Sequence, residues 1–214
     1  MKNAFIVVVA SWAILAIALP SFAETSGRFA SIGMNFGGSS IFGSINGYHF
    51  GAELNYRFNE RLAVRAEFIR AFSKSSFASS GPYYSSSDTI KYTLIPADFS
   101  FLYVMPLNKD FAAYIGVGGG YYSLTIDESS IRSGLSNEPQ LTGQTYNLNA
   151  WAPHVCLGLE AYISKRFGIF GEAKYFAAKD KLVKNEEGSF STEQDFNYGG
   201  PQLKIGIRFY FISQ

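Results

Sequence analysis

The sequence predicts an all-β protein, namely an eight-stranded antiparallel up-and-down barrel that crosses a membrane and follows a cleavable signal peptide. Three observations predict this fold class. Apolar and polar residues alternate with a period of two along most of the chain. After the first 23 residues, no stretch approaches the roughly twenty apolar residues that a spanning helix needs. Aromatic residues make up 17% of the chain and charged residues only 16%, below the usual proportion of about a quarter in soluble domains.

Composition also excludes several classes of function. The 214 residues include 18 basic and 17 acidic side chains, and the formal net charge of +1 provides neither a basic face for nucleic acid nor an acidic tail. A single cysteine, Cys156, excludes an intramolecular disulfide framework, a Cys-rich metal site and an iron–sulfur cluster. We therefore expect no cofactor and no nucleic-acid partner.

The start of the chain has the composition of a signal peptide. Lys2 supplies a positive charge, the run from Ala4 to Leu19 is apolar, and small residues then precede a cleavage site between Ala23 and Glu24. A membrane anchor is the alternative, but the run is slightly short for a spanning helix and no positive stop-transfer flank follows it. The expected organisation is a signal peptide at 1–23 and a barrel domain at 24–214.

The alternation is most regular between Tyr48 and Phe58. Every even position in this segment is apolar and every odd position is small or polar, which is typical of a strand with one apolar face and one wet face. A tight polar turn at 59–60 follows. The next segment repeats the pattern, with Phe68 on the apolar side and Arg65 on the polar side.

Eight segments of this kind are found. Pro96 interrupts the fourth, where we expect a β-bulge with a change of register. The fifth contains the glycine-rich run Tyr114–Tyr121, and its glycines stand where bulky side chains would crowd a narrow interior. The expected strands cover residues 28–37, 46–58, 61–73, 89–105, 111–126, 147–163, 167–178 and 198–212.

The connections between these segments alternate between short and long. The short turns are expected at 59–60, 106–110 and 164–166. The longer links, rich in Ser, Gly, Asn and acidic residues, are expected at 38–45, 74–88, 127–146 and 179–197. This rhythm is typical of a meander in a bacterial outer membrane, with tight periplasmic turns and larger external loops. Closure into a barrel removes the sheet edges that lipid does not tolerate.

The last strand ends in a pattern of polar residue, glycine and two aromatics, formed by Lys204, Gly206, Phe209 and Phe211. This pattern resembles the C-terminal assembly signal of bacterial outer-membrane barrels, although three residues follow the last aromatic here. Together with the runs 114–121 and 170–175, it makes the chain similar to the small eight-stranded OmpA/OmpX/OmpW-like outer-membrane barrels. The resemblance implies a location in the outer membrane of a Gram-negative bacterium and insertion by the barrel assembly machinery.

If the apolar face meets lipid, the opposite face places charged residues inside the barrel. An interior of eight strands is just wide enough for side chains to fill, and buried charges there must be paired. We therefore expect a charge network that plugs the barrel, while a polar passage for a small solute is the alternative. The expected interior network consists of Glu53, Arg57, Arg65, Glu67, Asp98, Glu160, Glu172, Lys174, Lys204 and Arg208.

Catalysis is a further alternative, because some barrels of this kind modify lipid. The chain has only two histidines, His49 and His154. His154 and Cys156 share a strand face, which is compatible with a Cys–His nucleophile pair, but packed interior side chains are the preferred interpretation. No spacing of His, Cys, Asp or Glu indicates a metal site.

The external loops are the expected contact surface. The serine-rich segment 73–88 contains Tyr83 and Tyr84, and the mixed-charge segment 179–197 is also polar, so an extracellular ligand or protein is the expected partner besides membrane lipid. The sequence thus favours a non-enzymatic outer-membrane protein with a structural or surface-interaction role. A narrow porin-like channel for small or hydrophobic solutes and a lipid-modifying enzyme are the alternatives.

Overall fold

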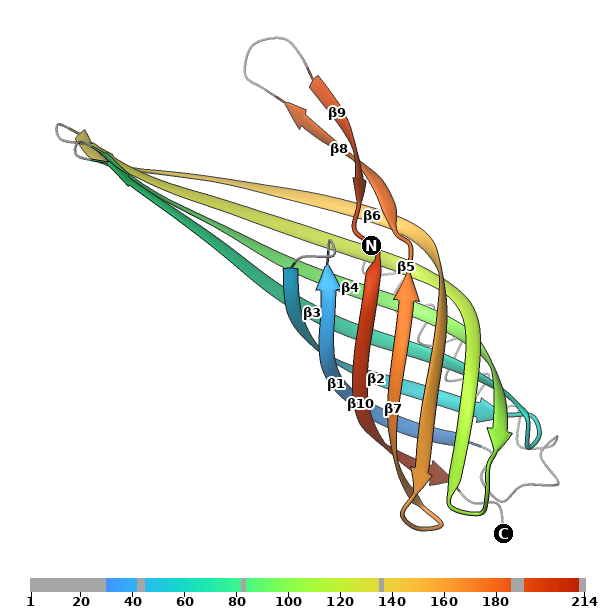
Figure 1. The fold of residues 1–214 in the computed structure, drawn as a ribbon. Helices are drawn as coiled ribbons and strands as arrows, with labels where there is room; N and C mark the ends of the chain where they lie inside the picture. The colour runs from blue at the N-terminus through green and yellow to red at the C-terminus, as the bar shows by residue number, and fades with distance from the viewer. Residues whose placement is uncertain (1–29, 42–44, 82–83, 135–136, 186–190, 212–214) are drawn as a thin grey trace.

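The computed structural model describes residues 30–41, 45–81, 84–134, 137–185 and 191–211. The expected signal peptide and its cleavage site between Ala23 and Glu24 lie outside the described residues. The described residues form ten β-strands (Figure 1). In chain order these are β1 (Ala30–Ile41), β2 (Ile45–Arg57), β3 (Leu62–Gly81), β4 (Tyr84–Pro106), β5 (Phe111–Gly134), β6 (Asn137–Tyr162), β7 (Phe167–Phe176), β8 (Lys179–Asn185), β9 (Ser191–Asn197) and β10 (Gly200–Phe211).

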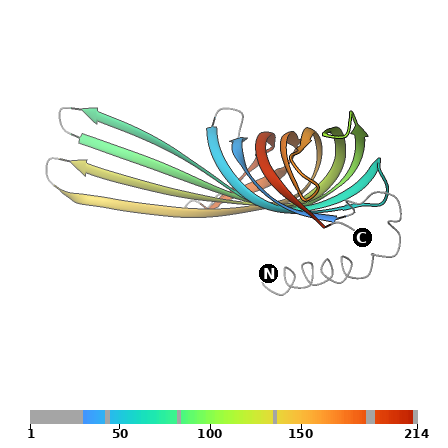
Figure 2. The ribbon, with the colours of Figure 1, turned by 90° about the horizontal axis from the view of Figure 1, so that it is seen from below.

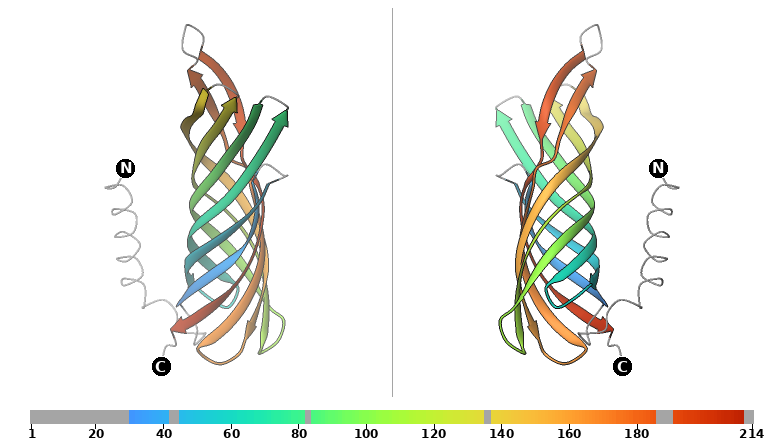
Figure 3. Two further views of the ribbon diagram at one scale, coloured as in Figure 1. Left: turned by 90° about the vertical axis from the view of Figure 1, so that its left-hand side faces the viewer. Right: turned by 90° about the vertical axis from the view of Figure 1, so that its right-hand side faces the viewer.

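Eight of these strands close into a barrel, in the order β1, β10, β7, β6, β5, β4, β3, β2. All neighbouring pairs are antiparallel, and β1 closes the ring against β10 from the pair Ala30–Phe211 to the pair Ser39–Gln202. Figure 3 shows the closed ring of tilted strands from two sides. The predicted eight-stranded antiparallel barrel is therefore confirmed.

Three short turns, at 58–61, 107–110 and 163–166, gather at one end of the barrel, which we call the turn end. Each turn uses the same local chemistry. A side-chain oxygen of Asn59, Asn108 or Ser164 accepts hydrogen bonds from the backbone N–H groups two and three residues later, at 2.8–3.2 Å. These bonds stabilise tight connections, as Asn and Ser commonly do in turns.

Two of the links expected as loops, 74–88 and 127–146, are instead mostly strand. β3 and β4 remain paired from Ser73–Tyr92 to Gly81–Tyr84, and β4, β5 and β6 continue alongside them. Figure 2 shows these four strands leaving the barrel on one side. The prediction was wrong because both faces of this extension are largely polar, so no alternation marks it, while the backbone ladder and cross-strand contacts such as Thr145 Oγ1 to Asp127 Oδ1 (2.8 Å) support it.

The prediction of a loop at 179–197 is also wrong in part, because residues 179–185 and 191–197 form the hairpin β8–β9. This hairpin stands at the barrel end opposite the short turns, which we call the hairpin end (Figure 1). Asp180 Oδ2 accepts a hydrogen bond of 2.7 Å from the backbone N–H of Asn149, which fastens β8 to β6. The expected seventh strand accordingly ends at Phe176 rather than at 178.

Pro96 does not produce the expected change of register. The β3–β4 pairs on its two sides, Phe68–Ala97 and Ala71–Leu94, belong to one continuous register, and only the pairs between them are missing. A proline lacks the N–H that the ladder needs, so it interrupts the hydrogen bonds locally without inserting a residue. The register irregularity in the described strands lies instead between Arg132 and Gly134, in the extension of β5.

Side chains alternate between the inside and the outside of the barrel. In β10, Lys204 is 2% exposed, whereas its neighbours Leu203 and Ile205 are 65% and 54% exposed. The same alternation continues around the wall and gives the barrel an apolar exterior of the kind that faces lipid.

Two apolar layers lie inside the barrel. The hairpin-end layer consists of Ala71, Leu94, Tyr122, Leu124, Ile126, Leu148, Ala150, Ala152, Phe176, Ala178 and Tyr198. The turn-end layer consists of Ala63, Leu102, Val104, Ala112, Tyr114 and Cys156. Tyr198, which follows the β8–β9 hairpin, is fully buried and donates a hydrogen bond of 3.1 Å to the backbone oxygen of Tyr122. The chain returning from the hairpin thus helps to fill the hairpin end.

Candidate functional site in the barrel interior

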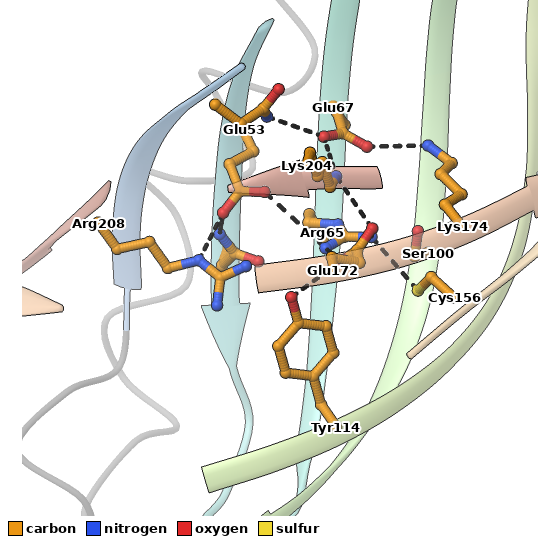
Figure 4. A network of polar contacts seen from close by, with 12 residues as sticks. Glu53, Arg65, Glu67, Ser100, Tyr114, Cys156, Glu172, Lys174, Lys204 and Arg208 are labelled. Carbon is orange, nitrogen blue, oxygen red and sulfur yellow. Dashed lines mark hydrogen bonds and ion pairs between the residues drawn. The ribbon is translucent and has the colours of Figure 1, made fainter. Parts of the chain in front are cut away.

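The ten charged residues expected inside the barrel come from inward-facing positions of β2, β3, β4, β6, β7 and β10. Nine of them are at most 7% exposed, and only the Arg57 side chain, at 15%, reaches the turn end. We refer to these ten residues as the interior charge network. Figure 4 shows several of its members converging from different strands. The period of two explains their shared direction, because residues two apart on a strand point to the same face.

Arg65 and Glu172 form the centre of the network. They face each other from β3 and β7, and Arg65 Nη2 donates a hydrogen bond of 3.0 Å to Glu172 Oε1, while Nη1 bonds the other carboxylate oxygen. Glu172 also pairs with Lys204 Nζ at 2.9 Å and accepts a hydrogen bond of 2.9 Å from the hydroxyl of Tyr114. Two-pronged pairing of this type is the strongest arrangement for a guanidinium and a carboxylate.

A second group of contacts lies toward the hairpin end. Lys174 Nζ is 2.8 Å from Glu67 Oε2 and 2.5 Å from Asp98 Oδ2. Glu67 is also paired with Lys204 and accepts a hydrogen bond of 3.0 Å from the amide of Asn35. The two lysines therefore bridge three carboxylates.

A third group lies toward the turn end. Arg208 donates from Nε to Glu53 Oε1 at 2.5 Å and from Nη1 to Glu160 Oε1 at 2.9 Å. Arg57 Nη2 approaches the other oxygen of Glu160 at 3.0 Å, and Tyr210 donates its hydroxyl proton to the same carboxylate. The guanidinium carbon of Arg208 lies 4.1 Å from the ring centre of Phe170, which is a cation–π distance.

The network as a whole balances five acids against five bases, and every carboxylate faces at least one cation. Removing such charges from water is costly, and only close pairing with additional hydrogen bonds offsets that cost. The arrangement therefore holds opposite walls of the barrel together through compensated charges.

Inward-facing glycines do not leave empty space. Tyr114, Gly158 and Glu172 are neighbours across three strands, and a Cβ on Gly158 would lie 2.4 Å from the Tyr114 hydroxyl that crosses it to reach Glu172. At Gly116, a Cβ would similarly lie 2.8 Å from Cys156 Sγ. The small residues are thus covered by side chains from adjacent strands, and an internal cavity near Arg57 has a volume of only about 10 Å³.

One part of the interior is polar but uncharged. Ser39, His49 and Gln202, on β1, β2 and β10, are at most 3% exposed. Within the described part of the chain, the Ser39 hydroxyl, both ring nitrogens of His49 and the Gln202 amide have no hydrogen-bond partner. The hairpin-end apolar layer does not include this part of the wall.

His154 and Cys156 do not form the nucleophile pair considered from the sequence. His154 Nε2 lies 2.8 Å from Ser100 Oγ, and Cys156 Sγ lies 3.4 Å from Arg65 Nη2. Ser100 is 54 residues from His154, so spacing along the chain gave no signal of this contact. Asp98 lies 3.9 Å from the same nitrogen of His154, whereas Nδ1 faces Tyr122, so the order of a Ser–His–Asp relay is absent from this buried group.

Four tyrosine and asparagine residues of the interior were not expected from the sequence. The period of two would have identified them, because each lies an even number of residues from another inward-facing residue of the same strand. They are Asn35, Tyr114, Tyr162 and Tyr210.

The residues of the expected assembly signal occupy both faces of β10. Lys204 belongs to the interior charge network, and a Cβ on Gly206 would lie 2.6 Å from the ring of Phe170. Phe209 and Phe211 point outward, with ring centres 5.5 Å apart. Tyr48, Phe58, Tyr103 and Tyr175 are among the exposed aromatics near strand ends, whereas the exposed Trp151 lies in the middle of β6.

Within the described residues there is no helix long and apolar enough to cross a membrane. The same residues contain no group of three or more His, Cys, Asp or Glu side chains that could hold a metal ion.

Comparison with solved structures identifies similar barrels. The outer membrane protein OprG from Pseudomonas aeruginosa is 13% identical, with a TM-score of 0.60 and coverage of 89% of this chain and 100% of OprG. Neisserial surface protein A is 16% identical, with a TM-score of 0.50 and coverage of 87% and 98%. The attachment invasion locus protein Ail of Yersinia pestis is 17% identical, with a TM-score of 0.42 and coverage of 86% and 100%. At these identities the similarity concerns the fold alone.

A comparison with curated proteins gives no match. A family model described as outer membrane protein beta-barrel domain matches residues 9–210, which is most of the sequence. The chain therefore belongs to the outer membrane protein beta-barrel domain family and lies in the cell outer membrane.

Proposed function

We propose that this protein is a non-enzymatic outer-membrane barrel with a structural or surface-interaction role and a filled interior. The observation that carries the proposal is the interior charge network, in which five acids and five bases compensate one another between two apolar layers. The burial of Ser100 and His154, which are 0% and 3% exposed, further supports a non-enzymatic role, because a substrate would have to displace packed side chains to reach them.

The extension of β3–β6 is the proposed contact surface for an extracellular ligand or protein. By the usual layout of such barrels, the turn end faces the periplasm and the hairpin end faces outward. Among the described residues, β3 beyond Phe72 pairs with β4 but has no partner strand on its other side. Backbone N–H and C=O groups on a strand edge of this kind can pair with an added strand.

A narrow channel is the second candidate, and the uncharged group of Ser39, His49 and Gln202 is the observation that favours it. Planar-bilayer conductance separates the two functions. We expect no steady current from the refolded parent and intermittent openings from a Glu172→Ala/Lys174→Ala variant. This change removes an acid from the centre of the network and a base from its hairpin-end group.

An exposed turn residue gives the matched control. Lys109→Ala removes a charge outside the barrel, and we expect this variant to give no current, as the parent does. A steady, ion-selective current from the parent would contradict the filled interior and make the channel the leading function.

We further propose that Lys204, Gly206, Phe209 and Phe211 form a signal read by the barrel assembly machinery. Phe211→Ala is expected to refold normally in lipid vesicles but to reach the outer membrane of cells at several-fold lower levels. Phe101→Ala is the control, because Phe101 is also outward-facing (60% exposed, against 47% for Phe211) and also has one edge-on aromatic neighbour. Equal membrane levels of the two variants would argue against the signal.

A further inference from the structure

The outer wall of the barrel is hollowed at the middle of β7, because the outward-facing residues Gly171 and Ala173 are small there. Gly171 lies between Leu159 of β6 and Ile205 of β10, and Ala173 lies in the next outward-facing row of the same strands. A Cβ added to Gly171 would have no neighbour closer than 4.0 Å. In Figure 1, β7 is the strand between β10 and β6. We call this hollow the β7 groove.

The β7 groove consists of two adjoining hollows with volumes of about 740 and 520 Å³. Both include Phe36, Leu159, Gly171 and Ile205, and apolar side chains dominate their walls. The larger hollow continues to the turn end, where Leu107 lines it. The groove is therefore long, apolar and open toward the membrane.

Exposed basic residues lie in the turns beside the turn end of the groove, which is lined there by Leu107 and Asn108. Lys165 and Arg166 are exposed in the turn that joins β6 to β7, and Lys109 is exposed in the neighbouring turn. Asp110 is the acidic residue in these two turns, so cations predominate. Basic residues at this level of a membrane attract anionic lipid headgroups.

We propose that the β7 groove binds one anionic glycerophospholipid, with an acyl chain against Gly171 and Ala173 and the phosphate beside Lys165 and Arg166. An unfilled hollow in a lipid-facing wall would forfeit dispersion contacts that a flexible hydrocarbon chain provides. Packing of this kind, rather than exclusion from water, drives association inside a membrane. The proposal requires the outer-membrane location and a turn end at the phospholipid headgroups, and it does not depend on a filled interior.

Native mass spectrometry of the full barrel, released from vesicles of phosphatidylglycerol, tests this proposal. We expect one lipid molecule to remain bound to the parent after the other lipids have been removed. Gly171→Leu/Ala173→Leu fills the groove and is expected to lower the retained fraction at least five-fold. Ala52→Leu, at an exposed position on β2, is the control for added bulk outside the groove and is expected to retain lipid as the parent does.

A second variant tests the charges without altering the groove. Lys165→Ser/Arg166→Ser is expected to lower retention of phosphatidylglycerol at least three-fold and to leave retention of phosphatidylcholine unchanged. This variant keeps the proposal testable if the double leucine variant does not fold. Equal retention by all variants would show an unspecific lipid coat, and a dimer mass lost on filling the groove would identify a second copy of the chain as the occupant; either result would overturn the proposal.

Discussion

Arg65→Met is expected to lower the free energy of unfolding by about 3–5 kcal/mol, because it removes one partner from a buried ion pair. The Arg65 side chain is fully buried, and its guanidinium neutralises Glu172 and lies 3.8 Å from Glu53. Methionine matches part of the volume, but it leaves Glu172 with Lys204 alone and Glu53 with Arg208 alone, so the network keeps one uncompensated negative charge. Urea unfolding of the barrel in lipid vesicles, followed by tryptophan fluorescence, measures the change.

Two comparison variants separate charge from general damage. Arg61→Met changes an exposed arginine at the turn end and is expected to alter stability by no more than about 0.5 kcal/mol. Arg65→Met/Glu172→Gln removes the uncompensated charge as well, so it is expected to recover part of the loss. If Arg65→Met were no more harmful than Arg61→Met, the interior charge network would contribute little to stability.

The large expected effect follows from where the partners lie in the barrel. Arg65 is on β3 and Glu172 is on β7, and these strands are not neighbours in the ring. Their contact therefore spans the interior, and so do the contacts of Lys174 on β7 with Glu67 on β3 and Asp98 on β4. Backbone ladders join only adjacent strands, whereas these side chains join opposite walls. Losing one member consequently affects several strands together.

The sequence allowed the direction of each side chain to be predicted, but not its partner. A period of two assigns Arg65 and Glu172 to the inward face of their strands, and the same parity predicts the direction of the other eight charged residues. It does not assign their heights along the barrel, because height depends on strand tilt and on the stagger between strands. Arg65 and Glu172 are 107 residues apart, and the tilt and stagger of the strands in the closed ring bring them to one level.

The membrane itself explains why the predictions failed beyond the barrel. Between Tyr48 and Phe58 one face meets lipid and the other meets the packed interior, so the two faces differ strongly in polarity. In the extension of β3–β6, water reaches both faces, and serine and threonine occur on each of them. A contact such as Ser76 Oγ to Thr89 Oγ1 (3.3 Å) stabilises pairing without leaving a periodic signal. Strands in that region are therefore recognised from backbone hydrogen bonds in the structure and not from the sequence pattern.

Gly118→Ala is expected to lower the free energy of unfolding by about 3 kcal/mol, the upper end of the usual cost of overpacking, although it adds a single methyl group. A Cβ on Gly118 would lie 2.0 Å from the backbone oxygen of Phe99 and 2.7 Å from His154 Nε2. The backbone oxygen belongs to a paired strand and has little freedom to move away. Urea unfolding in vesicles, with the parent in the same lipid, measures the loss.

The adjacent glycine provides the control. Gly119 points to the opposite face of β5, and a Cβ there would meet only the backbone oxygen of Ala152, at 3.3 Å. Gly119→Ala is therefore expected to change stability by less than about 1 kcal/mol, because the small strain is offset by the reduced flexibility of the unfolded chain. Similar losses for the two variants would mean that glycine content, rather than the inward direction, determines the effect.

The physical reason for the difference lies in the side chains that cross Gly118. Its neighbours on the two adjacent strands are Ser100 and His154, which form their 2.8 Å hydrogen bond across the space above the glycine. A methyl group at this position would separate two polar groups that are both buried. An infrared or NMR measurement of the His154 ring should therefore report loss of the Ser100 contact in Gly118→Ala and its retention in Gly119→Ala. Retention in both variants would show that the bond does not need the glycine between its partners.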